Sequence, residues 1–279
     1  MADSYMSLQA TQGDALSVPV KAAAVYAAQE NSLFLSGNLF PIVNAPNGII
    51  RVGELAKVTA TQLSAETTPD DIDATNPGLT KNDIQADLFV ARAVVRQLGN
   101  IDLNEIGFSL GKAVQQKFDG SIYESLDASA TEYDFNTTDT GTTFSMDDVF
   151  DAVKVIRQNG EQGALYGVVN PTIAAQLMKD IGSTSFAGGD FQTQAMREGF
   201  IGRIAGVTMF SSAMAGTTLT NGSSGFIFGA DSGRIAMQKG IDVATAPRVE
   251  AVGTDVVCNL HAGFGFLDAE RAVRLRSVA

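Results

Sequence analysis

The chain has 279 residues, of which 45% are hydrophobic, and its formal net charge at pH 7 is −12. This length and hydrophobic content allow one large domain or two smaller ones with a substantial core, which excludes an intrinsically disordered protein. Residues 1–160 hold nearly all of the charge imbalance, with 10 basic and 21 acidic side chains. A protein that grips DNA or RNA by its phosphates needs clustered Lys and Arg, so the charge argues against that class.

The sequence contains neither a long apolar run that could span a membrane nor a basic and apolar leader at its N-terminus. We therefore expect no membrane partner and synthesis in the cytoplasm of the host. A single cysteine, Cys258, excludes an internal disulfide. Stability has to come from packing or from association between chains.

The N-terminal third predicts an arm, a helix and a hairpin. Residues 1–19 are polar and indicate a loose arm, and the alanine-rich residues 20–35 predict a helix. Hydrophobic alternation in residues 50–63 and 84–90 predicts two half-buried strands, the second with an inward face of Ile84, Ala86, Leu88 and Val90. The linking residues include Glu66, Asp70, Asp71 and Asp73. An isolated hairpin is marginally stable in water, so we expect this acidic-tipped hairpin to lie on another surface.

A long helix is predicted for residues 102–127. Its apolar residues recur every fourth position, at Ile106, Leu110, Val114, Phe118, Ile122 and Leu126. Because four residues advance 400° around a helix of 3.6 residues per turn, this stripe winds around the rod, and we expect neighbours on more than one side. Glycine weakens a helix, so Gly107, Gly111 and Gly120 indicate close backbone contacts.

The remaining chain predicts an α/β unit followed by strands. Ser145 and Asp148 form a capping box before a helix that ends at Asn159-Gly160, and Asn170-Pro171 begins another helix after an apolar strand. The later strands, separated by Gly-containing or Pro-containing turns, are expected to form a predominantly antiparallel C-terminal sheet over 226–228, 234–238, 249–252, 256–261 and 272–276.

No motif for catalysis or cofactor binding is complete. Glycines 199, 202 and 206 resemble a phosphate-binding loop, but their spacing and the strand-like segment that follows favour structural turns. Cys258 and His261 fall on opposite sides of a strand, so we expect a buried cysteine and no nucleophile–base pair. We expect no enzymatic activity, no cofactor and no metal; a weak cation site at the acidic tip is the lesser alternative to a solvated loop.

The order of these parts resembles the major capsid protein of tailed double-stranded-DNA phages, which has the Hong Kong 97-type fold. The resemblance covers nearly the whole chain and is clearest in residues 101–120, 143–177 and 202–212. It implies an α+β fold with an N-terminal arm, an extended β-hairpin loop, a long spine helix, a peripheral antiparallel sheet and an α/β axial domain. In that family, a segment like residues 202–212 is a turn and a strand.

The resemblance also implies a division of the chain. Residues 1–19 would be the arm, 20–49 the N-terminal helix and its lead-in, and 50–90 the extended loop. Residues 91–143 and 226–267 would form the peripheral domain, with the spine helix at 102–127; residues 144–225 would form the axial domain, to which 268–279 return. Arg51 and Lys57, together with Glu66, Asp70, Asp71 and Asp73, are the candidates for contacts between subunits.

The function that follows is self-assembly into hexamers and pentamers of an icosahedral shell, in the virion, that encloses DNA without sequence-specific binding. A separate scaffolding protein and a portal are the expected partners, with a decoration protein as a further one. Three alternatives stay open: an encapsulin-type nanocompartment with enzyme cargo, a small carboxylate-using α/β enzyme, and a tail or decoration protein. An acidic subunit suits a container that does not hold DNA by its phosphates.

Overall fold

The computed structural model describes residues 20–26, 32–35, 39–55, 79–96, 103–134, 144–183, 203–215, 223–248 and 253–276. The expected N-terminal arm, the tip of the hairpin and the strand at 249–252 lie outside these residues, as do glycines 199 and 202.

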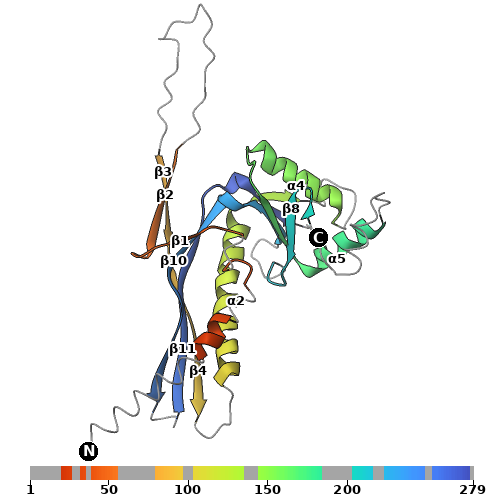
Figure 1. The fold of residues 1–279 in the computed structure, drawn as a ribbon. Coiled ribbons are helices and arrows are strands. Elements are labelled where there is room, and N and C mark those ends of the chain that lie inside the picture. The colour runs from red at the N-terminus through yellow and green to blue at the C-terminus, as the bar shows by residue number, and fades with distance from the viewer. Residues whose placement is uncertain are drawn as a thin grey trace, which may run out of the picture.

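The described strands form two sheets and one hairpin (Figure 1). The four-stranded sheet has the order β1-β10-β11-β4, formed by β1 Ile42–Asn44, β10 Gly233–Arg248, β11 Gly253–Phe266 and β4 Asp87–Arg96. The six-stranded sheet has the order β5-β12-β9-β6-β8-β7, formed by β5 Thr131–Asp134, β12 Ala272–Arg276, β9 Ser223–Gly229, β6 Leu165–Val169, β8 Val207–Ser211 and β7 Arg203–Ile204. Strands β2 Ile49–Leu55 and β3 Leu79–Gln85 pair only with each other.

Helix α2, Leu103–Ser129, lies along the four-stranded sheet, and α4, Met146–Gln158, and α5, Pro171–Ser183, pack with the six-stranded sheet (Figure 1). Short 3-10 turns precede β10 and β12, at η2 Ala230–Ser232 and η3 Ala269–Arg271. The expected long helix is confirmed, and its apolar stripe is buried in the main core. A second core cluster lies between α4, α5 and the six-stranded sheet.

Two of the three helix glycines make the close contacts expected of them. A Cβ at Gly107 would lie 2.6 Å from the carbonyl oxygen of Val20, and one at Gly111 would lie 2.3 Å from that of Ala24. The N-terminal helix, residues 20–26, therefore packs backbone against backbone on α2. Gly120 makes no such contact, since its nearest neighbour would be the methyl group of Met214 at 3.5 Å.

The expected helix over residues 20–35 is wrong at its end, where residues 33–35 form a turn. The turn directs Phe34 into the core, where its ring packs edge-on against Tyr123 of α2 at 5.3 Å between centroids and stacks on Phe40. Burying a ring of that size contributes about 1.5–3 kcal/mol, which favours the turn.

The expected strand over residues 84–90 is two strands in different sheets. β3 ends at Gln85 and pairs with β2, whereas β4 begins at Asp87 and pairs with β11. Ala86 separates them and donates its backbone N–H to the Gly48 carbonyl at 2.8 Å. The break reverses which side faces inward: Leu88 and Val90, expected on the buried face with Ile84, are exposed.

The expected single C-terminal sheet is also divided. β9 and β12 pair with each other in the six-stranded sheet, while β10 and β11 belong to the four-stranded sheet. The α/β unit is confirmed: β6 pairs in parallel with β8. The Ser145 backbone N–H donates to the Asp148 carboxylate at 2.7 Å in the expected capping box.

The described part of the glycine-containing stretch is a tight turn. Ile204 pairs with Val207, and the two residues between them, Ala205 and Gly206, have φ values of 51° and 83°. Positive φ at both central positions is the pattern of a two-residue hairpin turn, which favours glycine at the second. For Gly206, the structural interpretation is confirmed.

Candidate assembly surface

The described part of the hairpin β2–β3 projects from the body, and the contacts described below anchor its base (Figure 1). The turn before β2 is fixed by the Ala45 N–H, which donates to the Met237 carbonyl of β10 at 2.9 Å. A small apolar cluster of Ala45, Ile84 and Ala236, flanked by Ile50, Val52 and Leu267, packs beneath the base. The lower end of the hairpin is therefore anchored to the four-stranded sheet.

Two glycines of β11 allow the end of β3 to cross the sheet closely. A Cβ at Gly263 would lie 1.9 Å from the Gln85 carbonyl oxygen, and one at Gly265 would lie 2.3 Å from the Ile84 side chain. Side chains at these positions would lift the hairpin off the sheet. Gly263 and Gly265 thus determine the height and direction at which the hairpin leaves the body.

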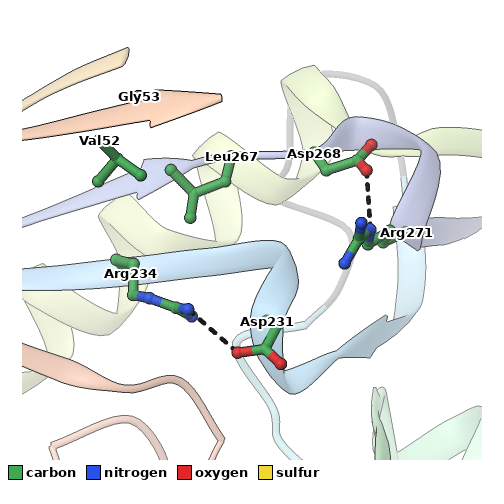
Figure 2. Close-up of a pocket in the computed structure, with 7 residues that line it drawn as sticks. All are labelled: Val52, Gly53, Asp231, Arg234, Leu267, Asp268 and Arg271. Carbon is green, nitrogen blue, oxygen red and sulfur yellow. Dashed lines mark hydrogen bonds and ion pairs between the residues drawn. The ribbon is translucent and has the colours of Figure 1, made fainter. Parts of the chain in front are cut away.

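A cleft of about 340 Å³ lies beside this crossing, between the hairpin and the turns before β10 and β12 (Figure 2). Val52 and Gly53 form its hairpin side, and Leu267 lies between them and the pair Asp268 and Arg271 (Figure 2). Arg234 pairs with Asp231 at 3.1 Å and Arg271 with Asp268 at 2.8 Å, and Arg271 also reaches the buried Glu161 at 3.3 Å. Because each arginine is paired with a carboxylate, the cleft carries little net charge. It lies at the base of the hairpin, and we assign it a structural role there.

Of the residues predicted to make contacts between subunits, Arg51 alone lies within the described chain. It is exposed on β2 and forms an ion pair with Asp83 across the same hairpin at 3.3 Å. Such an exposed pair adds little stability, and Arg51 stays accessible to another chain. Lys57, Glu66, Asp70, Asp71 and Asp73 lie outside the described residues.

An exposed apolar row on β4 was not predicted from the sequence. Leu88, Val90 and Val94 are 57%, 54% and 39% exposed on the face of the sheet opposite α2, and Arg92 between them pairs with Asp255 of β11. The inward face of the strand is also apolar, with Phe89, Ala91, Ala93 and Val95 against the core. A strand that is apolar on both faces is typically covered on both sides. The nearly continuous apolar run of β4 is therefore the sequence signal that could have identified the row.

β4 also forms one edge of the four-stranded sheet as described. It is ten residues long, and an exposed edge of that length presents backbone N–H and C=O groups that can pair with another chain. The apolar row and the open edge together make β4 the part of the described surface best suited to contact a protein partner.

Metal-ligand clusters and the cysteine were the remaining candidates for a chemical site in the described residues. No group of three or more His, Cys, Asp and Glu in this part of the chain could hold a metal ion. Cys258 is buried in the core, and burial raises the pKa of its thiol to about 11, so it is not a reactive thiolate at neutral pH. No described helix is long and apolar enough to cross a membrane.

No family model matches the sequence, and neither does any curated protein. Solved structures do match. The acid-stable capsid of Helicobacter pylori bacteriophage KHP30 gives a TM-score of 0.67 at 14% identity, covering 89% of this chain and 92% of that one. A chain from Mycobacterium phage Che8 gives 0.65 at 15% identity, covering 82% and 84%. The virus-like particle from Pyrococcus furiosus gives 0.64 at 11% identity, covering 93% and 99%.

Identities this low show the fold alone. The similarity nevertheless spans most of the chain, 82% in one case and 89% in the other. The resemblance inferred from the order of the sequence elements is therefore confirmed at the level of architecture. The chain has the α+β Hong Kong 97-type fold of tailed-phage major capsid proteins.

Proposed function

We propose that this chain is a major capsid protein, which self-assembles into hexamers and pentamers of an icosahedral shell around phage double-stranded DNA. The observation that carries the proposal is the hairpin β2–β3, which pairs with no other described strand and projects from the body (Figure 1). A lone hairpin is marginally stable, so it is expected to be covered by another molecule. The phage capsids of the same fold support this role.

The hairpin β2–β3 and strand β4, which carries the apolar row, extend in opposite directions from the junction of β3 and β4 (Figure 1). The hairpin of one subunit therefore does not cover its own β4. Two different surfaces of one chain that each need a partner produce head-to-tail contacts, which close into rings when the rotation between copies allows it. We infer that hairpins overlap neighbouring subunits and that the β4 row is buried between copies.

The parts of the fold are assigned to the domains of the phage capsid fold by their order and architecture. The hairpin β2–β3 is the extended loop, α2 is the spine helix, and the four-stranded sheet belongs to the peripheral domain. The six-stranded sheet with α4 and α5 corresponds to the axial domain, including the returning strand β12. Arg51 of the hairpin remains the described candidate for a charged contact between subunits. A scaffolding protein and a portal are the further partners proposed, and the role is structural rather than enzymatic.

Electron microscopy of the purified full-length chain, combined with light scattering, tests the proposal. We expect rings or closed shells, and we expect the triple variant Leu88→Thr, Val90→Thr, Val94→Thr to remain folded but unassembled. Phe150→Thr, which changes an exposed residue of α4, is the control and should assemble normally. A stable monomer at all concentrations would refute the proposal.

The contents of the particles distinguish a phage capsid from the nanocompartment alternative. Shells that protect double-stranded DNA support a phage capsid, whereas shells filled with a host enzyme support a nanocompartment. The matching structures named as phage capsids and heads favour the former.

A further inference from the structure

A buried polar cluster joins three segments of the chain near the middle of α2. Asp119 of α2 is 4% exposed; one carboxylate oxygen accepts from the Ser32 hydroxyl at 3.0 Å, and the other accepts from the Gln115 amide at 2.9 Å. The Ser32 oxygen in turn accepts the Leu35 backbone N–H at 3.0 Å. The carboxyl of Asp119 thus holds the turn at residues 32–35 against the helix.

The third segment is the turn after β8. Tyr123, one helical turn beyond Asp119, is hydrogen-bonded to Ser212, and the Ser212 hydroxyl also accepts the Met214 backbone N–H at 3.3 Å. Both sides of the cluster line a cavity of about 190 Å³, together with Leu33, Lys112 and Gln116. A cavity of that size with polar lining residues has room for water.

Few charged groups surround Asp119. Lys112 and Tyr123 of α2 line the same cavity, while residues 32–35 and 212–215 contain no titratable side chain. Cys258 of β11 is the titratable group in the core beneath the helix, and burial raises the pKa of its thiol. Among the described residues, the carboxylate forms no ion pair, and its two hydrogen bonds come from the neutral donors Ser32 and Gln115.

We propose that Asp119 is an acid-stabilised latch: when its carboxyl is protonated, residues 32–35 and the turn after β8 pack firmly on α2, and when it ionises this junction loosens. The latch lies within one chain and does not depend on the proposed shell. It would make the packing of the N-terminal segment on the long helix respond to pH in the mildly acidic range.

The direction of the effect follows from burial. Removing the carboxylate from water disfavours its charged form and raises the pKa of Asp119 from 3.8 to about 6, although the bonds from Gln115 and Ser32 act in the opposite sense. Since the pKa in the folded state lies above the unfolded value, this contribution to stability is complete below about pH 4 and is lost as the pH rises through about 6. A shift of about two pH units corresponds to a change of about 100-fold in the folding equilibrium.

Two measurements on the full-length, unassembled chain test the latch. The first is a ¹³C NMR titration of the Asp119 carboxyl in the wild-type protein, with Asp119→Asn used to assign the signal. We expect a midpoint near pH 6; a midpoint near pH 4 would overturn the proposal without requiring any variant to be stable.

The second measurement is hydrogen exchange, corrected for intrinsic rates, between pH 5 and pH 8. In the wild type, residues 32–35 and the middle of α2 should lose protection by about 10-fold across this range, because only part of the 100-fold change lies above pH 5 and amide exchange there reports local opening. Asp119→Asn keeps a neutral side chain and should lose no protection, while the control Glu124→Gln, on the exposed side of the same helix, should behave like the wild type. Equal pH dependence in the wild type and Asp119→Asn would also overturn the proposal.

Discussion

The carbonyl oxygen of Ala24 lies 2.3 Å from the position that a Cβ would occupy at Gly111. The N-terminal helix can therefore approach α2 this closely only because residue 111 has no side chain. The contact atom is a backbone oxygen, which cannot move away as the end of a flexible side chain can.

Gly111→Ala should destabilise the protein although alanine is the better helix former. Overpacking of a rigid contact costs about 1–3 kcal/mol, which exceeds the gain of about 1 kcal/mol in helix propensity. The matched control is Gly120→Ala in the same helix, whose new methyl group would meet only the methyl of Met214 at 3.5 Å. Urea denaturation should show opposite signs for the two variants; stabilisation by both would mean that the N-terminal helix can shift freely.

Replacing Ala205 should relieve strain in the turn between β7 and β8. Its φ of 51° lies in the left-handed region, which costs an ordinary L-residue about 1–2 kcal/mol and costs glycine little. We expect Ala205→Gly or Ala205→Asn to raise the free energy of unfolding by about 1 kcal/mol. Ala213→Gly, in the turn after β8, should instead lower it, because no strain is relieved there and glycine loses more backbone entropy on folding.

Gly263→Ala should disturb the hairpin more than the sheet that contains it. The added methyl group would lie 1.9 Å from the Gln85 carbonyl, so the end of β3 has to lift away from β11. We expect a loss of about 1–3 kcal/mol in stability and poor assembly, measured by denaturation and electron microscopy. Gly240→Ala, which would meet nothing within 4 Å, should assemble normally. Normal shells from Gly263→Ala would show that assembly does not depend on how closely the hairpin crosses β11.

Assembly should strengthen with salt. Each chain carries a net charge of −12, and salt screens the resulting repulsion between subunits, with a Debye length of about 10 Å at 0.1 M and about 3 Å at 1 M. Light scattering should therefore show more or faster assembly as the salt concentration rises from low to moderate values. Inhibition by moderate salt would indicate that attractive ion pairs, such as those proposed for Arg51, dominate the contacts.

The sequence was most informative where structure is local. The spacing of apolar residues identified α2, Ser145 and Asp148 identified the start of α4, and the order of elements indicated the architecture. Cys258 was expected to be buried and is. These features depend on neighbouring residues along the chain, whose geometry is set by backbone hydrogen bonding and side-chain period.

The candidate surface was less predictable. Arg51 is exposed, but its ion-pair partner, Asp83, belongs to the same hairpin, and Leu88 and Val90 were assigned to the wrong face. Alternation shows that a segment is a strand, yet both faces of β4 are apolar, so the pattern does not say which face meets the core.

By itself, the sequence determined the kinds of elements in this protein and their order, because helix and strand periodicity and capping are properties of short segments. Only the tertiary structure decided that the strand is interrupted at Ala86 and that β9 and β12 pair in the six-stranded sheet. It also decided that the apolar row of β4 is exposed. Those outcomes depend on pairing between residues far apart in the sequence, such as Leu88 with His261, and the burial of a face is set by the partner that packs on it.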